Sequence, residues 1–137
     1  ITLVSGDPLK NIPEIGPLDF LLIFTHSHPL DQAILESTIS KDFGYLGMIG
    51  SKTKVAKFFL RLKASGVPSG LFTKVSAPIG LDIGAESPEE IAISIVAELV
   101  RVRRGHVGPV QAMSEVEIPA RGGDGRGIAP ALSRKGL

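Results

Sequence analysis

Two uninterrupted apolar runs constrain the fold of this chain more than any other feature of its sequence. Residues 20–24 read Phe-Leu-Leu-Ile-Phe and residues 45–49 read Tyr-Leu-Gly-Met-Ile, with no charged or amide side chain in either run. A strand with one face in water alternates apolar and polar residues, whereas a strand inside a parallel sheet is covered on both faces and is apolar throughout. We therefore expect two strands that are buried on both faces of a parallel sheet.

Helical segments are predicted to alternate with these strands. Apolar residues recur at helical spacing in residues 30–40, and again in residues 51–66, where Ser51 offers an N-cap. Ser87 is followed by Pro88 and by a glutamate at the third helical position, which predicts a third helix to about residue 104. In the second helix the basic residues are expected on the solvent-facing side: Lys54, Lys57 and Arg61.

The order of elements favours an α/β fold. A short third strand is expected at residues 73–76, so strands and helices alternate along residues 1–104. This order predicts a three-layer domain with a parallel sheet. Residues 105–137 contain seven glycines and three prolines, and we expect a flexible tail there.

Composition excludes several classes of function. The chain has no cysteine, so it forms neither disulfides nor thiolate metal sites. A net charge of +1 gives no reason to expect a nucleic-acid or anionic-membrane partner. No apolar run reaches the roughly 18 residues that span a bilayer. Because no signal peptide is visible either, we expect a cytoplasmic protein.

A polar cluster directly follows the first apolar run. It reads Thr25-His26-Ser27-His28, and Asp31 opens the helix that follows. Ligands of open parallel sheets bind at the carboxyl ends of the strands, so this loop is expected to face a binding crevice. Imidazoles can donate hydrogen bonds to a ligand or bind a metal, although a histidine can also cap a helix or pack on the sheet. We expect a ligand contact from at least one histidine and, without an evident third ligand, no metal site.

The second apolar run leads into a glycine-containing turn, Gly47-Met-Ile-Gly50-Ser51-Lys52. Glycine allows a ligand to approach the backbone, and the following helix start offers free N–H groups. The serine hydroxyl and the lysine ammonium group suit phosphate. The spacing matches neither a Walker loop nor the G-x-G-x-x-G turn. The pattern alone therefore fits an anion site and a plain strand-to-helix turn equally well.

An apolar loop with two glycines precedes the third helix. It spans residues 78–84, and its Asp82 either binds a ligand or holds the loop, with no pattern to decide between the two. In the helix that follows, Glu98 is expected to be exposed and to pair with Arg101, three residues further on.

These motifs together resemble one known family. The segments are Thr25-His26-Ser-His28-x-x-Asp31, Tyr45-Leu-Gly-Met-Ile-Gly50-Ser51-Lys52-x-Lys54, Pro78-Ile-Gly-Leu-x-Ile-Gly84 and Pro88-Glu-Glu-Ile-Ala-Ile-Ser94-Ile. In order and spacing they resemble the C-terminal domain of the xanthine dehydrogenase accessory family (XdhC/CoxI) over residues 19–104. The resemblance implies a Rossmann-like domain of which this chain carries the C-terminal half, without the preceding glycine-rich half.

The family resemblance also implies a function. Its members are associated with binding the molybdenum cofactor (molybdopterin), supporting its sulfuration and delivering it to the apo-enzyme of a molybdenum hydroxylase. A chaperone of this kind needs no catalytic residue. An oxidoreductase that binds NAD(P) in the same crevice is the alternative, and a partner-docking domain is a third. The expected partners are the apo-enzyme and either a second copy or a chain that supplies the missing half. The expected cofactor-binding residues are Thr25, His26, His28, Asp31, Gly50, Ser51, Lys52, Gly80 and Asp82.

Overall fold

The computed structural model describes residues 3–113. The chain divides into two compact units, Ile1–Val107 and Gly108–Leu137, and all elements discussed below belong to the first. The predicted flexible tail falls mostly on residues 114–137, which lie outside the described residues. Its flexibility therefore stays a prediction.

In the described part of the chain, three parallel strands form one sheet. β1 (Phe20–Ile23) pairs with β2 (Tyr45–Met48), and β2 pairs with β3 (Val75–Ser76), which gives the order β1-β2-β3. In register, Phe20 lies opposite Tyr45. Both pairs are parallel, as the continuous apolar runs predicted. The third strand is shorter than expected because a 3₁₀ helix, η1 (Ser69–Lys74), occupies the residues before it.

Within residues 3–113, each strand is followed by one α-helix: α1 (His28–Thr38), α2 (Lys52–Ala64) and α3 (Pro88–Arg103). The two predicted N-caps are confirmed. The Ser51 hydroxyl accepts a hydrogen bond from the Lys54 N–H, and Ser87 forms a full capping box with Glu90. α1 begins two residues earlier than predicted because Pro29, with its fixed φ, fits the first turn of a helix.

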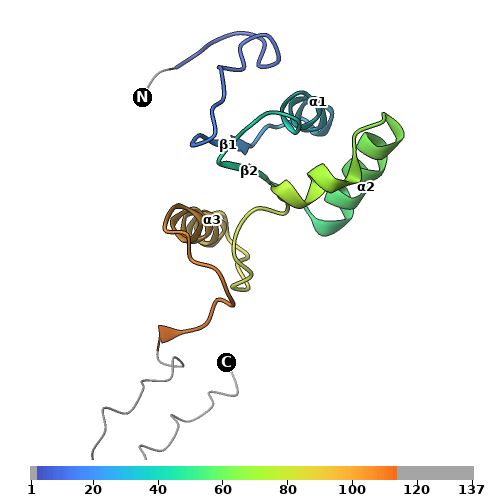
Figure 1. The fold of residues 1–137 in the computed structure, drawn as a ribbon. Coiled ribbons are helices and arrows are strands. Elements are labelled where there is room, and N and C mark those ends of the chain that lie inside the picture. The colour runs from blue at the N-terminus through green and yellow to red at the C-terminus, as the bar shows by residue number, and fades with distance from the viewer. Residues whose placement is uncertain (1–2, 114–137) are drawn as a thin grey trace, which may run out of the picture. The chain divides into compact units, whose positions relative to one another are not determined.

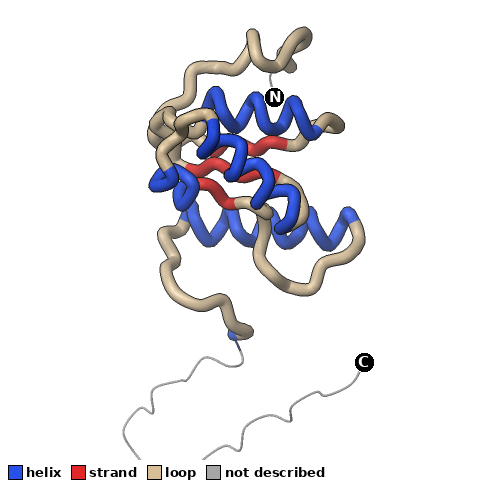
Figure 2. The backbone as a smooth tube through the Cα atoms, turned by 90° about the vertical axis from the view of Figure 1, so that its right-hand side faces the viewer, coloured by secondary structure: helices blue, strands red, loops and turns tan. Residues whose placement is uncertain are grey.

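The helices cover the two faces of the sheet, as Figure 2 shows: α1 and α2 lie on one face, and α3 lies on the other. Side chains of β2 alternate between two cores. Leu46 and Met48 pack against α1 and α2, whereas Tyr45 packs with Ile79 and with Ile95 of α3. The predicted three-layer α/β architecture is confirmed.

The prediction that β1 is buried on both faces is wrong for the described residues. Ile23 points into the core beneath α1 and α2, but Phe20, Leu22 and Phe24 are 38–46% exposed. The reason is the position of β1 at an edge of the sheet, while α3 packs beneath the neighbouring β2 (Figure 1). The apolar run therefore predicted the strand correctly, but it did not predict that one face of the strand is partly exposed.

Gly47 brings the loop after β3 close to the sheet. A Cβ atom at this position would collide with the side chains of Ile79 and Tyr45. Glycine therefore lets Ile79 pack directly on β2, where the Ile79 N–H donates to the Met48 carbonyl at 3.0 Å. This contact seats the loop of residues 78–84 beside the carboxyl end of the sheet. Among the described residues, no helix has both the length and the apolar character needed to cross a membrane.

Candidate functional site

A cavity of about 460 Å³ lies at the carboxyl ends of β2 and β3. Ile49, Gly50 and Lys52 form one wall, and the loop of residues 78–85 forms another. Ile91 and Ser94 of α3 complete it. This is where ligands bind in open parallel sheets, because loops and helix N-termini meet there. The cavity is mainly apolar, with Lys52 and Asp82 as its charged residues.

Two residues of α3 hold the cavity loop in place. The Ser94 hydroxyl donates to the Leu81 carbonyl at 2.6 Å, and the Leu81 N–H donates to the Ser94 carbonyl at 3.2 Å. One turn further along, the Glu98 carboxylate accepts a hydrogen bond from the Gly80 N–H. Glu98 is half-buried, so the expectation that it is merely exposed is wrong. Its carboxylate connects the loop to the helix.

Gly80 is required by this arrangement. Its φ of +108° is rarely adopted by residues with a side chain, and a Cβ would meet the Ser94 Oγ at 2.5 Å. The close approach of the loop to α3 therefore depends on a glycine at this position.

The start of α2 supplies the basic edge of the cavity. Ser51 caps the helix through its hydroxyl, and exposed Lys52 lies in the first turn. Helix geometry leaves the N–H groups of Lys52 and Thr53 without an acceptor inside α2. These donors, the partial positive charge of the helix start and the Lys52 ammonium favour an anion here.

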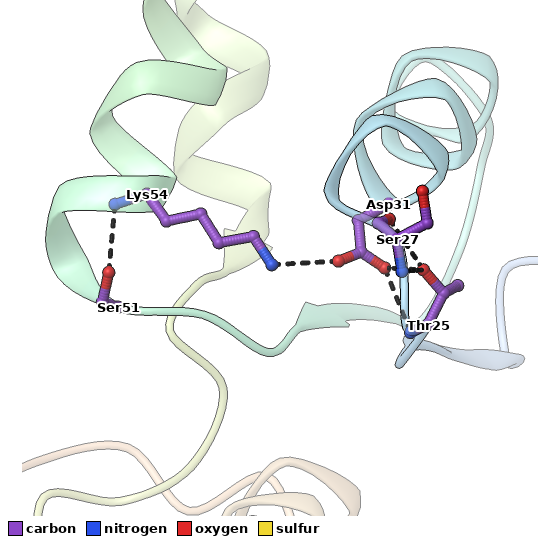
Figure 3. A network of polar contacts seen from close by, with 5 residues as sticks. All are labelled: Thr25, Ser27, Asp31, Ser51 and Lys54. Carbon is purple, nitrogen blue, oxygen red and sulfur yellow. Dashed lines mark hydrogen bonds and ion pairs between the residues drawn. The ribbon is translucent and has the colours of Figure 1, made fainter.

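A buried polar network fixes the loop after β1 (Figure 3). The Asp31 carboxylate accepts hydrogen bonds from the Thr25 N–H at 3.1 Å and the Thr25 hydroxyl at 2.6 Å. Its other oxygen pairs with Lys54 Nζ at 3.0 Å. The side chain of Asp31 is 0% exposed and that of Lys54 15% exposed. Lys54 was predicted on the solvent face of α2, which is wrong: it joins the starts of α1 and α2.

The structure separates the predicted cofactor-binding residues into three groups. Gly50, Lys52, Gly80 and Asp82 line the cavity. The second group makes hydrogen bonds within the protein: Ser51 caps α2 beside the cavity, while Thr25 and Asp31 belong to the polar network. The third group is His26, on the loop after β1, and His28, the first residue of α1; both are exposed, and neither lines the cavity. Sequence reasoning missed the positioning residues Lys54, Ser94 and Glu98. Among residues 3–113, no cluster of three or more His, Cys, Asp or Glu side chains could hold a metal ion.

Tyr45 places a phenol in the core between β2 and α3. Its hydroxyl is buried and has no hydrogen-bond partner of good geometry among the described residues. Burial raises the pKa of Tyr45 to about 12, while the Ser76 side chain opposes the rise and the Glu98 carboxylate adds to it. A group whose pKa is raised on folding stabilises the fold below its ordinary pKa and loses that contribution as the pH rises.

We expect the tyrosine to make the fold sensitive to alkaline pH. The unfolded phenol ionises near pH 10, and the folded one ionises near pH 12. The free energy of unfolding should therefore decrease as the pH rises from about 10 to about 12. Tyr45→Phe should remove this part of the decrease. The chain has one tyrosine and no tryptophan, so the absorbance of tyrosinate measures this pKa directly. A pKa near 10 in the folded protein would contradict the expectation.

Comparisons with known proteins agree with the Rossmann-like fold. The family model of the XdhC Rossmann domain matches residues 3–99. Over 95 residues the chain is 37% identical to YqeB, an uncharacterized protein of Escherichia coli (strain K12), covering 69% of this chain and 17% of that protein. Over 104 residues it is 36% identical to a probable xanthine dehydrogenase subunit of Bacillus subtilis (strain 168), covering 74% of this chain and 29% of that one.

A solved structure is also similar. The crystal structure of a xanthine dehydrogenase from Bacillus halodurans matches with a TM-score of 0.58 and 39% sequence identity, over 73% of this chain and 27% of that one. The chain thus spans less than a third of the length of each of these relatives. The family match covers the three strands, most of α3 and every residue that lines the cavity. The chain belongs to the XdhC Rossmann domain family.

Proposed function

We propose that this domain serves as an accessory factor for a molybdenum hydroxylase of the xanthine dehydrogenase type, and that it holds the molybdenum cofactor for delivery to the apo-enzyme. Two relatives named for xanthine dehydrogenase support the association with that enzyme. The observation that carries the cofactor proposal is the cavity at the strand ends, where a basic helix start faces an apolar loop.

The residues of the cavity fit a pterin that carries a phosphate. The Lys52 ammonium and the free N–H groups at the start of α2 would hold the phosphate. Ile49, Ile83 and Ile91 provide apolar surface for a flat ring. Asp82 offers a carboxylate that accepts hydrogen bonds from ring N–H groups. When bound, the cofactor supplies the redox chemistry of the client enzyme, and the residues of this domain bind and orient it.

The proposal predicts that Lys52 contributes to phosphate binding. Lys52→Ala should weaken the binding of a pterin phosphate by about tenfold, which is about 1.4 kcal/mol and close to the lower end of the range for hydrogen bonds to charged groups. The affinity for the same pterin without phosphate should not change. A titration that follows pterin fluorescence measures both constants. The protein adds little fluorescence of its own, because the chain contains no tryptophan and only one tyrosine.

Lys57 provides the matched control, since it is an exposed lysine of α2 that does not line the cavity. Lys57→Ala should leave both affinities unchanged. Equal losses in the two variants would mean that the site is not at the start of α2. A titration with NAD⁺ completes the comparison, and preference for NAD⁺ over the pterin phosphate would replace the proposal with nicotinamide binding.

A further inference from the structure

The side of α3 that faces away from the sheet carries an exposed apolar stripe. Ile93 is 63% exposed, Val96 57% and Val100 53%, and Ala92 is exposed beside them. Ala92, Ile93, Val96 and Ala97 form a shallow groove lined entirely by apolar side chains. The opposite side of the helix packs on the sheet through Ile91, Ile95 and Leu99. α3 is therefore apolar on two opposite sides, and among the described residues only one is covered.

The two ends of the stripe carry opposite charges at equal distances from its centre. Exposed Glu89 lies seven residues before Val96, and exposed Arg103 lies seven residues after it. Both belong to the same helical face as the stripe, because steps of three and four residues connect them to Val96 through Ala92 or Ile93 and through Val100. Ala92 and Val100 are likewise each four residues from Val96.

This pattern is complementary to itself in one orientation. If a second α3 lies antiparallel on the first about a two-fold axis at Val96, Glu89 faces Arg103 of the second copy, and Arg103 faces its Glu89. Ala92 faces Val100 of the second copy in the same way, so a small residue opposes a larger one. A parallel arrangement would instead place like charges together at both ends, which is unfavourable.

We propose that the outward face of α3 is a homodimer interface in which two copies pack antiparallel about Val96. A single helix pair buries less surface than a stable interface needs, so the dimer is weak, with a dissociation constant on the order of 10–100 μM. The charged ends select the antiparallel register, and the apolar stripe contributes the binding free energy.

Charge exchange tests the register directly. Glu89→Arg and Arg103→Glu should each weaken the dimer of the 137-residue chain by about tenfold, since each change replaces two attractive pairs with two repulsive ones. An equimolar mixture of the two variants should dimerise like the parent, because opposite charges again face each other at both ends of the stripe. Sedimentation equilibrium from about 10 to about 500 μM brackets the expected constant. Lys63→Glu changes a basic residue in the last turn of α2 and should leave the constant unchanged.

A disulfide provides a second readout because the chain has no cysteine of its own. Val96→Cys lies on the proposed axis, so mild oxidation should link most chains into dimers. Leu60→Cys, on the exposed side of α2 at 68% exposure, should give only background linkage. A parent chain that stays monomeric throughout the concentration range would overturn the proposal, as would a mixture no more dimeric than the separate charge variants. Protection of the introduced thiol from a thiol reagent in a monomeric Val96→Cys chain would assign the face to another segment of the same chain, which also overturns it.

Discussion

Replacement of Lys54 by methionine should lower the free energy of unfolding by about 3 kcal/mol. The methionine fills a similar volume but leaves the Asp31 carboxylate, which is fully buried, without its counter-charge. Breaking a buried ion pair from one side costs about 3–5 kcal/mol, and Thr25 still donates two hydrogen bonds to the carboxylate. The lower end of that range therefore applies. Urea denaturation followed by far-ultraviolet circular dichroism measures the change.

A double variant distinguishes the cost of the unpaired Asp31 charge from the cost of losing the lysine side chain. In Asp31→Asn with Lys54→Met, the asparagine carbonyl still accepts from Thr25 and no unpaired charge remains. This variant should recover most of the lost stability. Lys57→Met, on the exposed side of the same helix, should change the free energy of unfolding by less than about 0.5 kcal/mol. If Lys54→Met behaves like Lys57→Met, the ion pair does not support the fold.

Gly80→Ala should lower the free energy of unfolding by about 2–4 kcal/mol, with two separable causes. The φ of +108° is strained for alanine, and the added methyl group meets the Ser94 Oγ that holds the loop. Because Gly80 also lines the cavity, the same change should weaken binding of a pterin phosphate. Thermal unfolding and the fluorescence titration measure the two effects on one preparation.

Gly84 isolates the backbone contribution. Its φ is +73°, and a Cβ there would meet nothing within 4 Å. Gly84→Ala should therefore cost only about 1 kcal/mol, the cost of the backbone conformation. Adding Ser94→Ala to Gly80→Ala should relieve the collision in part. Equal losses at positions 80 and 84 would show that the contact with Ser94 does not matter.

Local signals in the sequence predicted the elements of the fold well. The caps at Ser51 and Ser87 each act on an amide three residues away, so the residues that form them are neighbours in the sequence. The apolar run at 45–48 likewise reports a strand that is buried along its whole length. The cover on the outer face of β1 was not predictable in this way, because it depends on where α3 packs.

The candidate site was predictable in outline only. Its position at the strand ends follows from the parallel order, and Lys52 and Asp82 do line the cavity. The pairing of Lys54 with Asp31 spans 23 residues, and that of Glu98 with Gly80 spans 18. Neither distance corresponds to a period of a helix or a strand. From the sequence alone, a lysine or a glutamate on an amphipathic helix is therefore predicted to be exposed. Only the packing of the helices shows which of them is paired inside the protein.

The attachment of the cavity loop to α3 has a thermodynamic consequence. Ser94 and Glu98 hold Gly80 and Leu81 from the inner side of two helical turns, and Val96 and Val100 project from the outer side of the same turns. Any displacement of this helix therefore reaches the wall of the cavity. If occupancy of the cavity changes self-association by some factor, self-association must change the affinity of the cavity by the same factor. This factor can be measured as the change in the dimer dissociation constant when the cavity is occupied, or as the change in ligand affinity when the chain is dimeric.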